Sequence, residues 1–416
     1  MKLSEELESR GFIHQFVGDS LSTIVDDEKR VVYHGIDPSA DSAHVGNFVA
    51  WVLLRHLALA GHKIVFLVGG GTGMLGDPKP DAERELKPVE DIQSNVEGLR
   101  AQAQSFFKDV PGEVEFVNNS EWLGELKFVD FLRDIGKHFT VNELVKKDAI
   151  ARRLESDVGL SYTEFAYPIM QGYDYLQLYR TKKCTLQIGG SDQWGNIVSG
   201  VDLIRRKEQA EVFALTIPLI VDKSSGKKFG KSEGNAIWLD PEKTTPYQFY
   251  QFWFNTSDEN VIDYLKLFTF LPLEDISVVE RDGLVNPSAR VAQKVLAREI
   301  TSLVHGEEQS DNAEHVTNVL FGDGELGDLS EEAKSILIKN APTYEVESGA
   351  NIVDVLVGSE LATSKREARM FVDSRAVALG EEKITDTEYC IDDNIFTGGI
   401  ALLRRGKKQM TVLVSK

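Results

Sequence analysis

The chain has 416 residues, of which 42% are hydrophobic and 27% charged, a balance typical of a globular protein with more than one domain. Its net charge of −20 argues against indiscriminate binding to nucleic acid, and no apolar run reaches the roughly 20 residues of a membrane-spanning helix. The two cysteines, Cys184 and Cys390, form no CxxC motif and the histidines form no HExxH motif, so no protein-bound metal is expected. So few cysteines favour a reducing, cytoplasmic location.

Short apolar strands alternate with helices through the first half of the chain. We expect strands at residues 31–36, 64–68, 114–117 and 184–188, and helices at 48–60 and 89–107. This alternation predicts βαβ units and therefore an α/β fold with a Rossmann-like parallel sheet. Ligands of such sheets bind outside the carboxyl ends of the strands, which here are residues 35–39, 69–77 and 189–193.

The strand signal fades after about Pro241, where an α-helical domain is expected. Helical periodicity covers residues 247–254, 261–268, 286–304 and 311–320. A loop follows at 321–328, and 343–349 is expected to be a hinge into a small α+β module. In that module we expect helices at 352–357 and from Ser364, and strands at 376–379 and 410–414. The expected domains are therefore a catalytic domain at 1–240, a helical domain at 241–325, a linker at 326–348 and a final module at 349–416.

Residues 349–416 are less acidic than the rest of the chain. They contain ten Lys and Arg and ten Asp and Glu, whereas the first 348 residues carry the whole net charge of −20. Positive clusters in such a tail are typical of a region that meets a polyanion. An ordinary solvated surface accounts for the same pattern, and composition alone favours that interpretation.

Two short segments have the composition of a phosphate site. His44-Val45-Gly46-Asn47 opens a predicted helix, where free amides and the positive end of the helix dipole attract anions. Lys227-Lys228-Phe229-Gly230-Lys231-Ser232 lies in a loop rich in Ser, Gly and Lys, which predicts mobile lysines able to reach phosphates. Each segment has a simpler explanation, a histidine beside a tight turn and a solvated hairpin respectively.

The segment Gly71-Thr72-Gly73-Met74-Leu75-Gly76 matches GxGxxG directly after a predicted strand, which makes a dinucleotide-dependent oxidoreductase an alternative function. That fingerprint should open a helix, but Pro78 and Pro80 block one here. The segment is not a P-loop either, because Asp77 stands where a Lys-Ser/Thr pair is required. We therefore expect the glycines to bring backbone close to a ligand, with Asp77 available for an ammonium group.

Polar residues gather at two further places. Tyr167, Gln171 and Asp174 are spaced i, i+4 and i+7, so on a helix they share one face and can line a polar pocket. Gly189-Gly190-Ser191-Asp192-Gln193-Trp194-Gly195-Asn196 follows a predicted strand and carries groups that hydrogen-bond a ribose or an amino acid. An amphipathic helix facing water and a helix-capping turn are the simpler interpretations of the two segments taken alone.

Together and in this order, these segments resemble a class I aminoacyl-tRNA synthetase, and most closely the bacterial-type tyrosyl-tRNA synthetases. HVGN resembles the class signature HIGH, and KFGKS resembles the mobile-loop signature KMSKS. Residues 33–42 and the loop ending Gly76-Asp77-Pro78 add to the resemblance, and residues 361–380 with the basic 404–408 are similar to an S4-type RNA-binding module. Asn47 replaces the second histidine of HIGH, and Phe229-Gly230 replaces Met-Ser while both lysines are kept.

The resemblance implies that tyrosine is activated by ATP to tyrosyl-adenylate and pyrophosphate, and is then transferred to the 3′ end of tRNA(Tyr). Such catalysis needs no protein nucleophile and rests on positioning and on stabilising charge at the phosphates. The implied ATP-binding residues are Gly35, Asp37, Ser39, His44, Gly46, Asn47, Asp192, Lys228, Lys231 and Ser232, of which His44, Asn47, Lys228 and Lys231 are catalytic. The implied tyrosine-binding residues are Tyr33 and Asp174 for the phenol, Asp77, Tyr167 and Gln171 for the ammonium group, and Gln193 for the carboxylate. Lys79 and Arg84 lie on another loop that the resemblance implies can reach the pyrophosphate, and Mg²⁺ is expected to arrive with ATP.

The resemblance also implies a homodimer and a tRNA partner. The implied tRNA-binding residues are Lys365, Arg366, Arg369, Arg404, Arg405, Lys407 and Lys408. A tryptophanyl enzyme of the same class is disfavoured, because a Tyr/Asp pair suits a phenol hydroxyl better than an indole N–H. An RNA-binding protein with a vestigial nucleotide site is disfavoured by the intact His44, Lys228 and Lys231.

Overall fold

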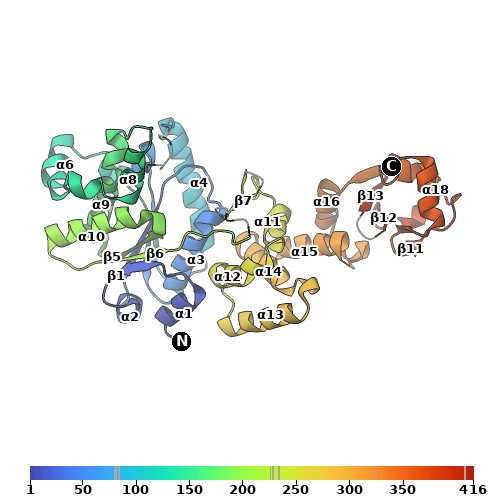
Figure 1. The fold of residues 1–416 in the computed structure, drawn as a ribbon, viewed down its shortest axis with the longest axis horizontal. Coiled ribbons are helices and arrows are strands. Elements are labelled where there is room, and N and C mark those ends of the chain that lie inside the picture. The colour runs from blue at the N-terminus through green and yellow to red at the C-terminus, as the bar shows by residue number, and fades with distance from the viewer. Residues whose placement is uncertain are drawn as a thin grey trace. The chain divides into compact units, whose positions relative to one another are not determined.

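A computed structural model describes residues 1–78, 82, 85–224, 226, 229–232, 235–322, 324–406 and 409–416, with Lys231, Ser232 and Asn235 described by their backbone alone. These residues form two compact units (Figure 1). The first comprises residues 1–244 and 255–296, and the second comprises 245–254 and 297–416. None of the described helices is long and apolar enough to cross a membrane.

The first unit is built on a six-stranded sheet in the order β1–β6–β5–β2–β3–β4. The strands are β1 (Gln15–Val17), β2 (Val31–Ile36), β3 (Lys63–Val68), β4 (Val114–Asn118), β5 (Cys184–Gly190) and β6 (Phe213–Ile217). Five of them are parallel, and β1 runs antiparallel to β6 at the edge. The predicted α/β fold with a Rossmann-like parallel sheet is therefore confirmed, and the chain order reverses between β2 and β5.

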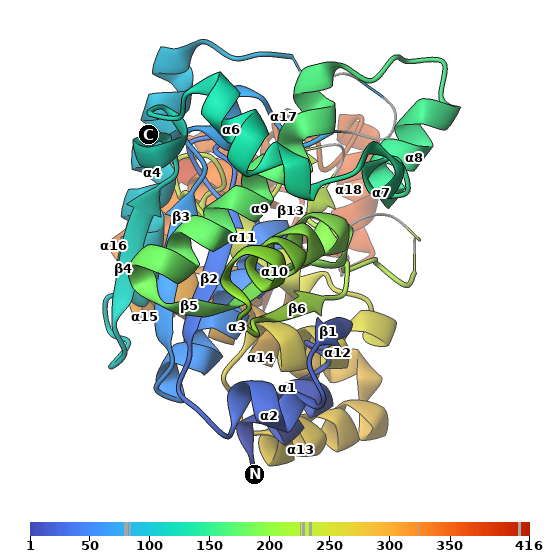
Figure 2. The ribbon, with the colours of Figure 1, turned by 90° about the vertical axis from the view of Figure 1, so that its left-hand side faces the viewer.

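Helices cover both faces of this sheet. α3 (Val45–Leu59) and α4 (Val89–Phe107) pack on one face, where Trp51 of α3 meets Phe66 of β3 with 5.4 Å between ring centroids. α9 (Tyr162–Lys182) and α10 (Trp194–Glu208) lie across the other face (Figure 2). These two helices approach closely because Gly172 and Gly200 face each other's helix: a Cβ at Gly200 would meet the Tyr175 ring at 2.8 Å.

Shorter helices complete the first unit. They are α1 (Leu3–Arg10), α2 (Leu21–Val25), α5 (Ser120–Leu123), α6 (Phe128–Asp134), α7 (Val141–Leu144), α8 (Asp148–Glu155), α12 (Asp258–Phe268) and α13 (Leu273–Val285). The helix expected at 286–304 is wrong at its start, because α14 (Val291–His305) begins only after a 3₁₀ turn over Pro287–Ala289. Arg290, with a φ of 50°, adopts a left-handed conformation that ends this turn and separates it from α14.

The second unit contains α11 (Pro246–Phe254), α15 (Glu307–Phe321), α16 (Glu331–Asn340), α17 (Ile352–Gly358) and α18 (Lys365–Asp373). Its five-stranded sheet has the order β11 (Glu382–Lys383), β10 (Val377–Leu379), β12 (Ile400–Arg405), β13 (Gln409–Ser415), β9 (Thr343–Val346). The expected hinge at 343–349 is wrong, because β9 pairs in parallel with β13 and belongs to this sheet. The expected linker at 326–348 likewise contains α16 and β9. The short segment of β9 has the sequence features of a connecting loop, and it forms a strand because it pairs with the distant β13.

Candidate active site

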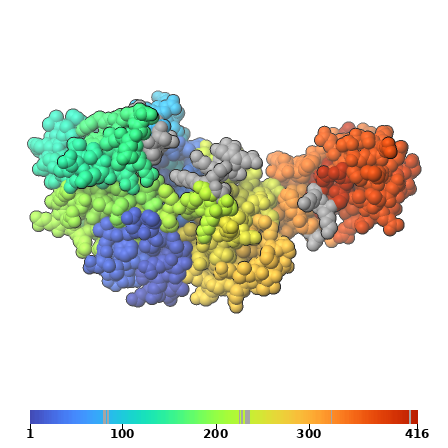
Figure 3. Space-filling model, in the orientation of Figure 1, coloured from blue at the N-terminus to red at the C-terminus, as the bar shows by residue number. Residues whose placement is uncertain are grey.

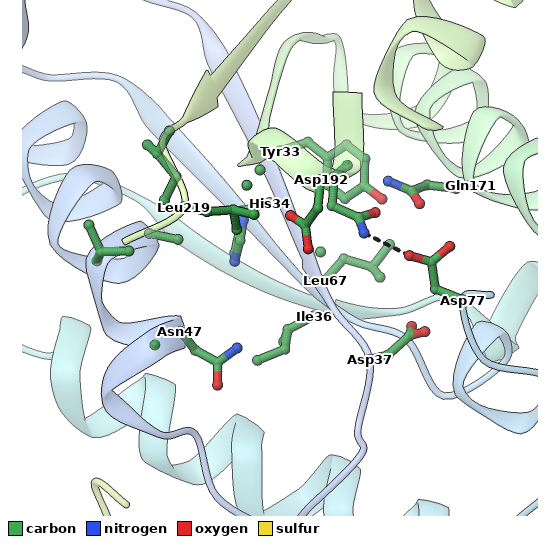
Figure 4. Close-up of a pocket in the computed structure, with 18 of the residues that line it drawn as sticks. Tyr33, His34, Ile36, Asp37, Asn47, Leu67, Asp77, Gln171, Asp192 and Leu219 are labelled. Atoms are coloured by element: carbon green, nitrogen blue, oxygen red, sulfur yellow. Dashed lines mark hydrogen bonds between the residues drawn. The ribbon is translucent and has the colours of Figure 1, made fainter. Parts of the chain in front are cut away.

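A pocket of about 320 Å³ opens at the carboxyl ends of β2 and β5, where the strand order reverses. Twelve of the predicted site residues line it: Tyr33, Gly35, Asp37, His44, Gly46, Asn47, Asp77, Tyr167, Gln171, Asp174, Asp192 and Gln193. They come from β2 and the residue after it, the first turn of α3, the loop after β3, the middle of α9 and the 3₁₀ turn after β5, and Figure 4 shows several of them facing one cavity. Ser39 does not line the pocket: it is exposed, and its N–H donates to the carbonyl of Asp37 at 2.8 Å.

One of the most buried side chains that line this pocket is the carboxylate of Asp174, which is 1% exposed. Its oxygens accept hydrogen bonds from Asn119 Nδ2 at 2.9 Å and from Trp122 Nε1 at 2.7 Å. Burial raises the pKa of Asp174 to about 7, although both hydrogen bonds favour the ionised form. Burial, followed by the charge of Asp174, also raises the pKa of the Tyr33 hydroxyl well above its usual range. The result is an oriented carboxylate beside a neutral phenol.

The hydrogen bonds of Asp174 continue across the pocket floor. Asn119 Nδ2 also donates to Thr72 Oγ1 at 2.8 Å, and Thr72 Oγ1 donates to Asp37 Oδ1 at 2.7 Å. The Tyr167 hydroxyl donates to Asp37 Oδ2 at 2.6 Å. Gly69 makes this arrangement possible, because a Cβ there would stand only 2.3 Å from Asp37 Oδ1. One network therefore joins Asp174 to Tyr167 before any substrate arrives.

The carboxylate of Asp77 lines the pocket as well. Its Oδ2 accepts from Gln193 Nε2 at 2.7 Å and its Oδ1 from Asn196 Nδ2 at 3.0 Å; Figure 4 marks a hydrogen bond to Asp77. Gln171 Oε1 is buried and has no hydrogen-bond partner among the residues that the structure describes. A carboxylate and an amide oxygen directed at one space form a site for a cation with several N–H donors.

The amino end of α3 forms another wall of the pocket. His44 Nδ1 accepts from the N–H of Gly46 at 3.0 Å, and Asn47 Oδ1 accepts from the N–H of His44 at 3.2 Å. Only glycine fits at position 46, because a Cβ there would lie 2.8 Å from the His44 ring. Since Nδ1 accepts, the imidazole carries its proton on Nε2, and Asn47 keeps its amide N–H groups to donate. Both side chains can therefore offer donors to an anion at the helix terminus.

The lysine-rich loop contacts the same helix terminus. Phe229 lines the pocket, and Lys231–Ser232 forms β7, which pairs with β8 (Asn235–Ala236). The predicted site residues Lys228, Lys79 and Arg84 lie outside the described residues, as do Lys407 and Lys408 of the tail.

Several residues that line the pocket, or that hydrogen-bond its carboxylates, were not predicted from the sequence. Asn119 and Trp122 follow β4; the strand itself was predicted, but the residues after its carboxyl end were not considered as site residues. Asn196 lies in a segment that was predicted to bind a ligand, but no role was assigned to this residue. His34 lines the pocket as well, and its Nδ1 hydrogen-bonds the carbonyl of Ile188 at 3.3 Å. Burial lowers the pKa of His34 to about 4, so the ring is neutral near pH 7.

A larger cavity of about 700 Å³ adjoins the pocket and shares Asp77, Asp192 and Gln193 with it. Three cationic residues, Lys146, Lys147 and Arg152, line its other side. The side chain of Lys147 is half-buried, and its Nζ donates a hydrogen bond to the carbonyl of Gly195 at 2.5 Å. Burial lowers the pKa of this amine. The cavity therefore places these cationic side chains next to the pocket, together with the acidic Glu143 and Asp148.

The described residues of the predicted tRNA-binding set occupy two settings. Arg366 and Arg369 are exposed on α18, and Lys365 on the same helix pairs with Asp354 at 2.5 Å. Arg404 and Arg405 instead support the fold in part, because they donate to the carbonyls of Val319 at 2.8 Å and Leu361 at 2.7 Å. Arg366 and Arg369 are thus the residues with charge directed wholly at solvent.

Comparisons with known proteins point to one family. The model for tRNA synthetases class I (W and Y) matches residues 26–322, and the model for the tyrosine–tRNA ligase SYY-like C-terminal domain matches residues 332–413. Tyrosine–tRNA ligase 2 of Enterococcus faecalis is 45% identical over 98% of each chain. Tyrosine–tRNA ligase 1 of Streptococcus thermophilus is 46% identical over 99% of this chain and 100% of its own. A C-terminally truncated mitochondrial tyrosyl-tRNA synthetase of Aspergillus nidulans matches in structure with a TM-score of 0.69 and 30% identity, over 77% of this chain and 94% of that one.

Proposed function

This chain belongs to the class I tyrosyl-tRNA synthetases, enzymes that charge tRNA with tyrosine at the expense of ATP, and we propose how its residues divide that work. Membership of this family excludes the alternative function of a dinucleotide-dependent oxidoreductase. The proposal assigns the Asp174 side of the pocket to the tyrosine side chain, the Asp77 side to its ammonium group and the α3 terminus to the ATP phosphates. Mg²⁺ is proposed to be bound to those phosphates, and the enzyme to work in the cytoplasm.

Tyrosine is proposed to enter with its phenol against Asp174. The ionised carboxylate accepts the phenol O–H, and the hydroxyl of Tyr33 donates to the same phenol oxygen. The ammonium group then faces Asp77 and Gln171 Oε1, the buried oxygen without a partner among the described residues. Tyr167 also accepts from this group, because its own proton is donated to Asp37. Gln193, next to Asp77, is placed to donate to the substrate carboxylate.

Activation is proposed to proceed by in-line attack of the tyrosine carboxylate on the α-phosphorus. An O–P bond forms, the bond to the leaving phosphate breaks, and pyrophosphate departs with increased negative charge. The Nε2–H of His44 and the amide of Asn47 donate to the phosphates from the helix terminus, and Lys228 and Lys231 neutralise the leaving group. Asp192 accepts from the ribose, with Gly35 and Gly46 allowing the nucleotide to approach the backbone.

Transfer is proposed to use the larger adjoining cavity. A hydroxyl oxygen of the terminal tRNA adenosine forms an ester bond to the carbonyl carbon of tyrosyl-adenylate, the bond between that carbon and the phosphate oxygen breaks, and AMP and the hydroxyl proton leave. The cavity supports this path, because it opens beside Asp192 and Gln193 and carries Lys146, Lys147 and Arg152 for the phosphodiester backbone. In this scheme the acceptor end reaches the activated carbonyl from the side opposite the α3 terminus.

The final module is proposed to bind tRNA through α18. The test is the double variant Arg366→Ala/Arg369→Ala, with Lys383→Ala on exposed β11 as the matched control. Two lost phosphate contacts should reduce the slope of log affinity against log salt by roughly 1.5–2 units. Pyrophosphate exchange, which needs no tRNA, should be unchanged in both variants. An unchanged salt slope in the double variant would exclude these arginines from the tRNA contact.

A homodimer is proposed to form through the surface around α6. Residues 128–141 lie at the surface, in the teal part of Figure 3. Four apolar side chains of this segment are exposed, with exposed fractions of 66% for Phe128, 72% for Val129, 39% for Leu132 and 63% for Val141. An apolar cluster of this kind usually marks an interface. Sedimentation of Phe128→Asp/Val129→Asp should give a monomer, and a retained dimer would place the interface elsewhere.

The single observation that carries the proposed substrate assignment is the Asp174 carboxylate, buried beside Tyr33 and oriented by Asn119 and Trp122. It provides a charged acceptor for a hydroxyl at the end of an aromatic ring. The test is exchange of pyrophosphate into ATP with tyrosine, phenylalanine and tryptophan as separate substrates. Exchange should depend on tyrosine, and equal exchange with phenylalanine would contradict the assignment of this pocket end.

A further inference from the structure

The lysine-rich loop is attached to α12 at its start. Asn260 Nδ2 donates to Asp222 Oδ1 at 3.1 Å, and Asn260 Oδ1 accepts from the N–H of Lys223 at 3.1 Å. Lys223 Nζ also pairs with Asp263 at 2.5 Å. These contacts hold residues 222–223, which lie several residues before the lysines that the proposed function uses. They do not by themselves determine where those lysines stand.

Phe229 makes a second attachment to the same helix. Its ring lies 4.9 Å from that of Tyr264 and 5.3 Å from that of Phe268, and the side chain is 8% exposed. Phe268 in turn stacks on Phe48 of α3 at 6.2 Å, with the two planes 11° apart. The four rings form one cluster, which connects the loop to α12 and to the helix that opens with His44. Aromatic pairs of this geometry stabilise a contact beyond the burial of their area.

The backbone next to Phe229 is fixed as well. The N–H of Phe229 donates to the carbonyl of Ile220 at 3.1 Å, and the carbonyl of Gly230 accepts from Ile237 at 3.1 Å. Gly230 has a φ of +89°, and a Cβ there would lie 3.0 Å from Val45 Cγ2 and 3.3 Å from the Gly46 nitrogen. This turn therefore lies directly against the first turn of α3, the proposed phosphate site.

We propose that Phe229 is the positioning residue of the loop: its ring, wedged between Tyr264 and Phe268, sets the point from which the flanking Lys228 and Lys231 reach the ATP phosphates. The inference rests on the proposed role of those two lysines. Lys228 is the neighbour of Phe229 in the sequence, and the Cα atom of Lys231, two residues later, lies within about 8 Å of the anchored residue. A displacement of the anchor by 1 Å is enough to cost roughly 10²-fold in rate.

The kinetic test compares Phe229→Ala with Phe229→Leu in the full-length protein. The matched control is Phe107→Ala, which removes an equally buried ring of α4 that contacts Trp51 and Phe66 and not the loop. Phe229→Ala should lower kcat for pyrophosphate exchange by about 10–100-fold. Its KM for tyrosine should stay within about twofold, and Phe229→Leu should recover most of kcat because it restores apolar volume. Phe107→Ala should lower Tm but leave kcat of the folded enzyme close to wild type.

A second measurement needs no catalysis. Trypsin cleaves after lysine, and Lys227, Lys228 and Lys231 flank the anchor. Loss of the anchor should speed cleavage in this segment by about tenfold in Phe229→Ala, with no change in Phe107→Ala. Faster cleavage with unchanged kcat would show that the lysines do not act in activation, and so would refute the proposed function rather than the anchor. Unchanged cleavage, or a loss of kcat matched by an equal loss of tyrosine affinity, would refute the positioning role.

Discussion

The two ends of the pocket are held together in different ways. At the Asp174 end, polar side chains form a continuous hydrogen-bond network, which reaches from Trp122 to Tyr167 through Asp174, Asn119, Thr72 and Asp37. At the α3 end, the lysine-rich loop is held by ring packing of Phe229, by backbone hydrogen bonds and, at its start, by polar contacts of residues 222–223 with α12. A network of fixed dipoles suits recognition of a small neutral hydroxyl, whereas a packed loop suits charge that is needed only in the transition state.

This contrast predicts that variants at the two ends will fail in different steps. The largest effect is expected for Lys231→Ala, which removes a proposed cation for the leaving pyrophosphate. Loss of one such donor typically costs about 3 kcal/mol, or roughly 10²-fold in the rate of tyrosyl-adenylate formation. The measurement is the single-turnover rate at saturating tyrosine and ATP. A rate within threefold of wild type would remove Lys231 from the mechanism.

The next largest effect is expected at the other end, for Asp174→Asn. The amide cannot offer a charged acceptor to the phenol, and hydrogen bonds to charged groups contribute about 1.5–3 kcal/mol. The value of kcat/KM for tyrosine should therefore fall by roughly 10–100-fold, while that for phenylalanine changes little. Thermal unfolding is the control, because the amide must also accommodate Asn119 and Trp122. Equal losses for the two amino acids would show that Asp174 supports the fold and does not select the substrate.

The pH dependence of tyrosine binding should report the same carboxyl. Because burial raises the pKa of Asp174 to about 7, the acceptor is lost as pH falls through 7, and tyrosine affinity should fall with it. For folding, the effect of pH has the opposite sign. Between about pH 4 and 7 the carboxyl of Asp174 is protonated in the native state but ionised in the unfolded state. This group therefore stabilises the fold at low pH, and the stabilisation is lost as pH rises through 7. Trp122→Phe, which removes one donor to the carboxylate, should move the midpoint of the binding profile upward. A binding profile that is flat from pH 5 to 8 in wild type would contradict this assignment.

The smallest effect is expected for Tyr33→Phe, which removes one neutral partner of the phenol. The expected cost is about 0.5–1.5 kcal/mol in tyrosine binding and almost nothing for phenylalanine, so discrimination shrinks by roughly 2–12-fold. Discrimination by the tyrosyl enzyme against phenylalanine, at about 10⁵-fold, is itself a standard example of rejection by unpaired polar groups. The measurement is kcat/KM for pyrophosphate exchange with both amino acids. A parallel loss for phenylalanine would place the phenol elsewhere.

The fold was predictable where local signals agree with burial. The strand at 31–36 and the helix at 89–107 agree with β2 and α4 at both ends, since each combines strong periodicity with turn residues at its limits. The segment 343–349 was predicted wrongly because Thr343–Val346 becomes a strand only by pairing with β13, about 70 residues later in the sequence. Such long-range pairing leaves little trace in a short window.

The candidate site shows the same limit. Residues at strand ends and helix starts, such as Asp37 and His44, were predicted because the topology of a parallel sheet directs them to one edge. The hydrogen bond between Tyr167 and Asp37 joins residues 130 positions apart. In the sequence, nothing distinguishes Asn119 from any other asparagine after a strand, and its role is visible only from its hydrogen bond to Asp174. Partnerships of this kind arise from tertiary packing, so sequence spacing does not reveal them.

The most direct test of the contrast between the two ends is the equilibrium affinity for tyrosine measured without ATP, by calorimetry, in wild type, Lys231→Ala and Asp174→Asn. If the tyrosine end is formed in advance, wild type and Lys231→Ala should bind tyrosine with the same Kd, and Asp174→Asn should bind it about 10–100-fold more weakly. If tyrosine binds only when ATP is present, or if Lys231→Ala weakens binding as much as Asp174→Asn does, the two ends are not independent and the account is wrong.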